Sequence, residues 1–218
     1  MPPELLGEVP AKGTALAPFD LSRDVESDLE RFVALLFEWQ ATHNLVAPKT
    51  LAEIWTRHVA DSLQLLPLTS ESARRWIDLG SGGGFPGLVV AIAGKARGIE
   101  VTLVEANHKK AAFLRQAARV CAPNATVVSE RIEALSDGRA GRFDVVSARA
   151  LAPLDTLLAL AAPLLASGGV LLAMKGKEYV HEEASAAHIW SFDRILFESA
   201  AGGGGTIAAI SNPKLRKA

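Results

Sequence analysis

The chain has 218 residues, of which 49% are hydrophobic, and its formal net charge is −1. This length suits one full-sized domain with an appendage, and no apolar run reaches the eighteen or so residues of a membrane-spanning helix. The near-neutral charge excludes a surface coated in positive charge, so a nucleic acid would have to bind at a local patch. The first twenty residues lack the basic end and apolar block of a secretory signal, and the single cysteine, Cys121, cannot form an internal disulfide. We therefore expect a cytoplasmic protein that does not enter a membrane.

The first third of the chain is expected to be helical. Residues 1 to about 20 are rich in Pro, Gly and Ala without periodicity, which predicts a loosely held lead-in. From Ser22, apolar residues recur at i, i+4, i+7, i+8 and i+11, the pattern of one helix face. Thr50 and Glu53 fit a capping box that opens another helix. We therefore predict an N-terminal helical extension over residues 1–70.

Residues 71–218 alternate short apolar strands with helices, which predicts an α/β fold with a parallel sheet and right-handed crossovers. Asn107 is expected to cap the helix after the second strand. Two further strands near the end predict a hairpin that closes the sheet, and we interpret Gly202 to Gly205 as its flexible turn rather than a ligand cradle. The expected strands are 76–79, 101–105, 125–128, 143–148, 169–174, 189–197 and 206–210.

A glycine-rich turn, Gly80 to Gly87, follows the first strand. In an open α/β sheet, ligands bind at the carboxyl ends of the strands, and glycines there let the backbone approach a ligand closely. Glu105, at the end of the second strand, can accept two hydrogen bonds from a ribose diol. The turn is therefore a predicted site for a nucleoside cofactor.

Two cofactor classes fit this turn. Gly82-x-Gly84-x-x-Gly87, followed by Glu105, formally matches the dinucleotide fingerprint of nicotinamide-dependent oxidoreductases. Asp78 just before the first glycine, the stiff Phe85-Pro86 start of the next helix and the C-terminal hairpin favour S-adenosylmethionine and a methyltransferase instead. A methyltransferase for a protein or small molecule and a non-catalytic binding module remain open at this point.

The segment Asp78 to Gly87 resembles the signature of the ribosomal RNA small subunit methyltransferase G family. The resemblance runs from about residue 25 to the end of the chain. The glycine–Phe-Pro-Gly turn together with a His-x-x-Asp-Ser helix is specific to this family, whereas glycines alone are not. The other matching segments are Asn44-Leu45, Arg57 to Leu63, Leu103 to Leu114, and Ser147 to Ala150 with Lys175-Gly176.

The resemblance implies a Rossmann-like class I methyltransferase fold in residues 71–218, with a mostly parallel seven-stranded sheet and a C-terminal antiparallel hairpin. It implies S-adenosylmethionine-dependent methylation of N7 of one guanosine, guanine 527, in 16S rRNA. The partner would be the small ribosomal subunit or its precursor, and nothing in the sequence demands more than a monomer. The resemblance places Gly80, Phe85, Ile132, Glu133 and Arg149 at the cofactor, to which the reasoning on the turn adds Gly82 and Glu105.

Candidate substrate contacts are His58 and Asp61 on an N-terminal helix and the basic residues Lys109, Lys110 and Lys175. Each has a plainer interpretation: His58 also fits a buried histidine satisfied by the protein, Asp61 a surface pair, and the lysines a solvated face. Guanine N7 carries a lone pair and no proton, so we expect no catalytic base. We also expect no metal, because no His/Cys cluster has the spacing of a metal site.

Overall fold

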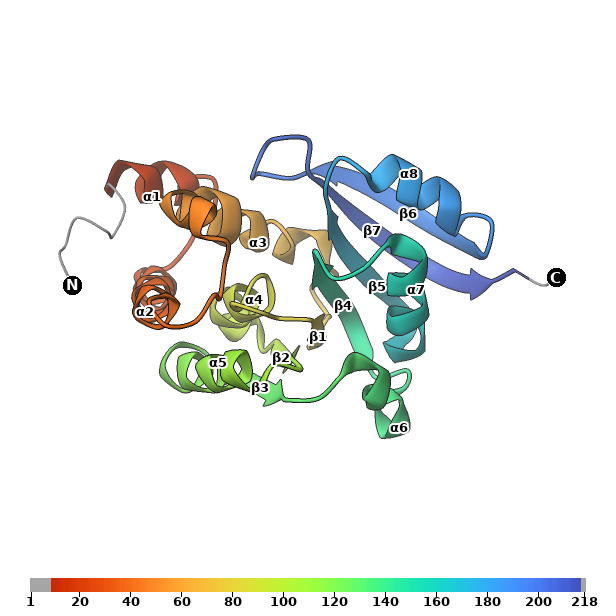
Figure 1. Ribbon diagram of the computed structural model, residues 1–218, viewed down its shortest axis with the longest axis horizontal. Helices are drawn as coiled ribbons and strands as arrows, with labels where there is room; N and C mark the ends of the chain where they lie inside the picture. The colour runs from red at the N-terminus through yellow and green to blue at the C-terminus, as the bar shows by residue number, and fades with distance from the viewer. Residues whose placement is uncertain (1–8, 217–218) are drawn as a thin grey trace.

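The protein, described here by a computed structural model over residues 9–216, is built on one twisted seven-stranded sheet (Figure 1). The strand order is β3-β2-β1-β4-β5-β7-β6. The first five strands pair in parallel, whereas β7 is antiparallel to both of its neighbours, β5 and β6. The predicted parallel sheet with a C-terminal hairpin is confirmed. The strands are β1 (Arg75–Leu79), β2 (Glu100–Val104), β3 (Ala125–Val128), β4 (Phe143–Arg149), β5 (Leu165–Lys175), β6 (Trp190–Glu198) and β7 (Thr206–Leu215).

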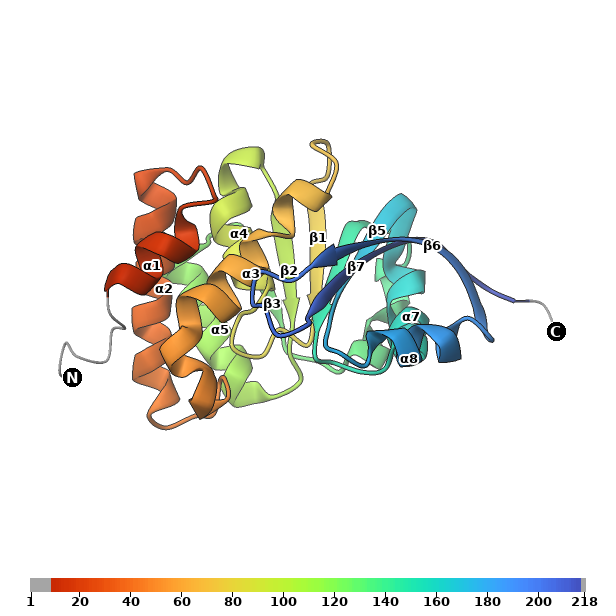
Figure 2. The same cartoon turned by 90° about the horizontal axis from the view of Figure 1, so that it is seen from above.

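Helices cover both faces of the sheet, as Figure 2 shows from above. One face buries α2 (Arg23–Gln40), α4 (Gly87–Gly94) and α5 (His108–Cys121) in the larger hydrophobic core. The other face packs against α7 (Leu154–Ala161) and α8 (Tyr179–Ala186), and the short α6 (Ser136–Arg139) lies after β3. None of the described helices is long and apolar enough to cross a membrane. Short 3-10 turns are η4 (Leu66–Leu68), η5 (Lys95–Arg97), η6 (Ile132–Leu135) and η7 (Ala162–Leu164).

Helix starts follow the expected capping chemistry. Ser22 accepts a hydrogen bond from the Val25 N–H at 3.3 Å and begins α2. Asn107 accepts from the Lys109 and Lys110 N–H groups at 3.0 and 3.2 Å and begins α5. An N-cap oxygen satisfies amide donors that have no partner within the helix, so local sequence alone fixes these boundaries.

The N-terminal lead-in differs from the prediction. Val9–Leu16 forms α1, whose Ala15 and Leu16 are buried, and Lys12 pairs with Glu26 and Glu30 of α2. The expectation of a loosely held segment is therefore wrong for this part, while residues 1–8 lie outside the described residues. The apolar side of α1 packs on a segment some forty residues away, a contact that short-range periodicity does not reveal.

The predicted capping box at Thr50 and Glu53 is also wrong. The Thr50 hydroxyl donates to the Ala47 carbonyl at 2.8 Å, and Glu53 pairs with Arg57 at 3.3 Å rather than reaching back. A 3-10 turn, η2 (Pro48–Glu53), leads into a wider π-helical turn, η3 (Ile54–Ala60), before α3 (Asp61–Leu63). Pi-helical turns are rare and often occur at functional sites.

The N-terminal helices and the sheet share one core. Phe32 of α2 packs against Phe85 of the glycine turn in a tilted arrangement with ring centroids 5.2 Å apart, and it also packs near Phe113 of α5. A Cβ at Gly84 would come within 3.0 Å of the Phe32 ring. The core runs without a break from the N-terminal helices to the sheet. The division of the chain into residues 1–70 and 71–218 therefore stays a prediction.

Candidate active site

The glycine turn leaves β1 in a conformation that requires glycine. Gly80, Gly82 and Gly84 have φ angles of +70°, +53° and +93°, which L side chains rarely adopt. A Cβ at Gly80 would lie 2.8 Å from a Leu151 methyl group, whereas one at Gly82 would meet nothing closer than 3.7 Å. The backbone at Gly82 is therefore open on one side, as a cradle for a ligand must be.

Glu105 lies directly beside this open backbone. One carboxylate oxygen accepts from the Gly82 N–H at 2.8 Å, and the other accepts from the Asn107 N–H at 2.8 Å. Each carboxylate oxygen has two lone pairs, so both retain capacity for a hydroxyl donor. Turn and carboxylate together fit the adenosine part of the expected cofactor.

Asp78, near the end of β1, holds the start of the glycine turn in place. The carboxylate is fully buried and accepts from the Ser147 hydroxyl of β4 at 2.6 Å and from the Gly87 N–H of α4 at 3.2 Å. The Trp76 indole N–H donates to the same Ser147 hydroxyl at 2.8 Å. Burial raises the pKa of Asp78 to about 6, against these hydrogen bonds. Asp78 thus ties β1, β4 and α4 together at the base of the turn.

Arg149, at the end of β4, connects the turn to the N-terminal helices. Its guanidinium lies 5.4 Å from the centroid of the Phe85 ring, a cation–π arrangement, and donates to Nδ1 of His58 at 2.7 Å. His58 in turn packs against Phe85 in a tilted arrangement, with ring centroids 4.9 Å apart. The structure therefore brings together three of the predicted residues, drawn from three distant segments.

The contacts of His58 define its tautomer. Arginine has no acceptor, so Nδ1 must accept from Arg149, and Nε2 carries the proton that it donates to the Thr50 hydroxyl at 2.9 Å. The Thr50 hydroxyl donates its own hydrogen bond to the Ala47 carbonyl, so it can accept from His58. Burial, and then the positive charges of Arg149 and Arg57, lower the pKa of His58 to about 3. His58 is a neutral, oriented partner of Arg149.

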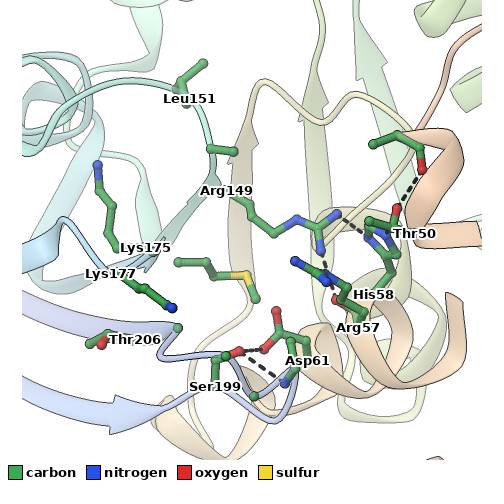
Figure 3. A pocket seen from close by; sticks show the side chains of 18 of the residues that line it. Thr50, Arg57, His58, Asp61, Arg149, Leu151, Lys175, Lys177, Ser199 and Thr206 are labelled. Carbon is green, nitrogen blue, oxygen red and sulfur yellow. Dashed lines mark hydrogen bonds between the residues drawn. The ribbon is translucent and has the colours of Figure 1, made fainter. Parts of the chain in front are cut away.

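A cavity of about 840 Å³ opens beside this cluster, over the carboxyl ends of β4 and β5 (Figure 3). The loop between β6 and β7 forms its far wall with Gly202, Gly203 and Gly205. Cationic side chains gather around it: Lys49, Arg57, Arg149, Lys175 and Lys177, against the two acids Asp61 and Glu182.

Asp61 is buried in the wall of this cavity, with 5% of its surface exposed. Its Oδ1 accepts from the Ser199 hydroxyl of the β6–β7 loop at 2.5 Å. The expected alternative, a surface pair with Arg57, is wrong, because Arg57 pairs with Glu53 and Asp61 is not at the surface. Burial raises the pKa of Asp61, and the Ser199 hydrogen bond opposes that rise.

The remaining predicted residues lie at various distances from the cavity. Lys175 lines it, but its ammonium is held by Glu182 at 2.6 Å and by the Ala152 carbonyl at 2.5 Å. Ile132 is half-buried after β3, and Glu133 is exposed and pairs with Arg131 at 2.9 Å. Lys109 and Lys110 begin α5 at the same edge of the sheet without lining the cavity.

Sequence reasoning missed three features of the site. The sequence predicts Thr50 as a helix cap, indicates no role for Ser199, and predicts Gly202 to Gly205 as a turn without a role in binding. Gly202, Gly203 and Gly204 do have the positive φ angles of a turn, yet the loop also walls the cavity. Among the residues that the structure describes, no cluster of three His, Cys, Asp or Glu side chains is arranged to hold a metal ion.

Solved structures with the same architecture define the class of the fold. Cofactor-bound Rv0187 from MTB matches with a TM-score of 0.58 at 17% identity, covering 84% of this chain and 89% of that one. A putative O-methyltransferase from Klebsiella pneumoniae matches with a TM-score of 0.58 at 14% identity, covering 93% and 96%. The fold is that of the class I S-adenosylmethionine-dependent methyltransferases, as predicted.

The family is shown by sequence. The family model GidB, rRNA small subunit methyltransferase G, matches residues 25–203. A ribosomal RNA small subunit methyltransferase G of Bradyrhizobium sp. (strain ORS 278) is 49% identical over 200 residues, covering 91% of this chain and 90% of the relative. One of Methylorubrum populi is 49% identical over 189 residues, covering 86% and 89%. The chain belongs to the rRNA small subunit methyltransferase G family.

Proposed function

We propose that this protein transfers a methyl group from S-adenosylmethionine to N7 of guanine 527 in 16S rRNA, on the small ribosomal subunit or its precursor. It would do so as a cytoplasmic monomer. Relatives named ribosomal RNA small subunit methyltransferase G, together with membership of their family, support the rRNA as substrate. The choice of N7 of guanine rests on the family resemblance and on the chemistry of the cavity.

The observation that carries the proposal is the concentration of positive charge at the cavity. The whole chain has a net charge of −1, yet five cationic side chains line one cavity that holds two acids. Phosphate contacts supply much of the affinity for RNA, so a local cationic rim supports binding there. The cavity adjoins the glycine turn through Leu151 and Arg149, so a base within it would lie next to a cofactor held by the turn.

The reaction would need positioning rather than a base. Bound S-adenosylmethionine supplies an electrophilic methyl group. Guanine N7 already presents an in-plane lone pair, so no side chain has to remove a proton, and His58 is neutral with both ring nitrogens engaged. Holding two reactants in line supplies several kcal/mol of rate enhancement in general. Phe85 and Arg149 would exclude water between turn and cavity.

Individual roles follow from position. We assign the cofactor to Gly80, Gly82, Phe85, Glu105 and Arg149, with Ile132 and Glu133 closing the adenine side after β3. We assign the target base to the cavity wall at His58 and Asp61. The proposed RNA-facing edge includes Lys109, Lys110 and Lys175. Because Lys175 is already paired with Glu182, its role would be to hold the cavity wall in place.

The test uses small subunits that lack the modification, incubated with the protein and radiolabelled S-adenosylmethionine. We expect one methyl group per subunit, at a guanosine that borohydride and aniline treatment cleaves, as N7 methylation requires. Parallel reactions with free 16S rRNA identify the accepted substrate. Label on protein, on another base, or none at all would refute the proposal. Calorimetry with S-adenosylmethionine and NADH separately tests the oxidoreductase alternative.

A further inference from the structure

Asp61 is a buried carboxylate that makes no ion pair with the described residues, although the positive charges of Arg149 and Arg57 act on it from a longer distance and oppose the rise of its pKa. Among the described residues, no lysine, arginine or histidine nitrogen lies within ion-pair distance of it, because Arg57 pairs with Glu53 and Arg149 with His58. The Ser199 hydroxyl donates to Oδ1, the backbone amide of Ala201 also favours the ionised carboxylate, and Oδ2 faces the cavity (Figure 3). A buried charge without such a partner is costly, so its presence in a cavity wall indicates a ligand that supplies the missing donors.

The carboxylate is also held in place from a distant part of the chain. Ser199 lies 138 residues from Asp61, on the β6–β7 loop. Gln64, one turn after Asp61, donates to the Glu198 carbonyl at 3.2 Å and accepts from the Ala200 N–H at 2.5 Å. The loop is therefore fastened to α3 at two points, and the direction of the Asp61 carboxylate is set before any substrate binds.

The geometry points to Asp61 as the residue that selects guanine, by accepting hydrogen bonds from the N1–H and the 2-amino group of the target base. This inference rests on the proposed function and specifies how its site recognises the base. A carboxylate is an acceptor only. Of the four RNA bases, guanine alone offers two adjacent N–H donors on its Watson–Crick edge.

This mode of recognition agrees with the proposed reaction. N1 and the 2-amino group lie on the opposite edge of guanine from N7, so a base held by Asp61 keeps N7 free. Methylation at N7 makes the base cationic, and a carboxylate on N1–H and the 2-amino group stabilises that charge as it develops. Asp61 would thus determine specificity and assist the reaction without removing a proton.

The experiment measures kcat/KM for small subunits that carry guanosine, inosine or xanthosine at the target position. Inosine lacks the 2-amino group, and we expect wild-type protein to use it roughly 10- to 100-fold less well, the effect of one charge-assisted hydrogen bond. Xanthosine replaces that amino group by a carbonyl, so Asp61→Asn should discriminate against guanosine and prefer xanthosine. The matched control Asp155→Asn, on α7 outside the cavity, should keep the wild-type order of kcat/KM values for guanosine, inosine and xanthosine.

The outcomes separate the two proposals. No methylation of guanosine subunits by wild-type protein refutes the proposed function itself. Methylation at N7 with equal use of guanosine and inosine by wild-type protein overturns the role of Asp61, and this comparison needs no variant to fold. An unchanged preference in Asp61→Asn, with S-adenosylhomocysteine binding intact by calorimetry, overturns it as well.

Discussion

Replacing His58 by glutamine should change how the stability of the protein depends on pH. The imidazole is 8% exposed, accepts from Arg149 through Nδ1 and donates to Thr50 through Nε2. Protonation would put a second positive charge against the Arg149 guanidinium and remove its acceptor. Glutamine offers an acceptor and a donor but does not titrate, so His58→Gln removes the pH dependence of this position.

The size of the effect follows from the two pKa values. In the unfolded chain His58 titrates near 6.5, and burial lowers the pKa in the folded protein to about 3. Between these values the unfolded state binds a proton that the folded state does not, so the free energy of unfolding falls as the pH falls. At about 1.36 kcal/mol per pH unit, the loss from pH 7 to pH 5 is roughly 2 kcal/mol.

Asp78 acts in the opposite direction over much of the same range. Its folded pKa of about 6 lies above the ordinary value of 3.8, so the folded state holds its proton more tightly. Stability from Asp78 is present below pH 3.8 and is lost as the pH rises through 6. The total pH dependence of wild-type protein therefore understates that of His58, whereas the difference between wild type and His58→Gln isolates it.

Urea unfolding at pH 5, 6, 7 and 8 measures this difference. We expect the stability of wild type relative to His58→Gln to fall by roughly 2 kcal/mol between pH 7 and pH 5. The control His181→Gln, at an exposed position on α8, should follow wild type. If the wild-type and His58→Gln curves run parallel, His58 is not held neutral and the assigned tautomer is wrong.

Three further predictions concern the turn, the cofactor and the RNA. Gly87→Ala would place a Cβ 2.6 Å from the Asp78 carboxylate, so it should lower the free energy of unfolding, measured in urea, by about 1–3 kcal/mol. The control Gly176→Ala, whose Cβ would meet nothing within 4 Å, should leave that free energy unchanged. Equal stabilities of the two variants would contradict the packing argument. Glu105→Ala should raise the calorimetric Kd of S-adenosylmethionine roughly 10- to 100-fold, and Glu100→Ala at the exposed start of β2 should leave it unchanged. Lys177→Ala should reduce the slope of log K for subunit binding against log salt by about 1, whereas Arg119→Ala, in the last turn of α5, should not alter it. The reverse result would place the RNA at the opposite edge of the sheet.

The sheet and the cofactor turn could be predicted because their signals are local. A strand such as β1 is a short apolar run bounded by glycines, and Asn107 caps α5 through amides two and three residues away. The positions of Gly80 and Gly82 demand positive φ angles that glycine alone adopts readily. Each of these requirements is met within a few residues, so the local sequence is enough to predict it.

The second half of the site could not be predicted because its partners are far apart in sequence. Thr50 and Glu53 match a capping box, yet Thr50 instead bonds to Ala47 and to His58, a choice that the position of Arg149 helps to determine. The helix α8 has a weak apolar pattern and packs mainly on α7, so the sequence pattern alone does not predict it. Nothing near Ser199 in the sequence indicates that its hydroxyl will meet Asp61.

The helices before residue 70 are part of the active site rather than an addition to it. They supply His58, which orients Arg149, and Asp61, which faces the cavity. They also supply Phe32, which packs against Phe85 of the glycine turn. Without these helices, Arg149 would border the cavity without the acceptor that His58 provides. We place the proposed cofactor site at the strand ends and the proposed substrate contacts His58 and Asp61 on the helical segment, so we expect this segment to determine which substrate reaches the methyl donor. In our proposal, substrate choice in this chain therefore rests on η3, α3 and the β6–β7 loop, where the buried Asp61 faces a cavity lined by cationic side chains.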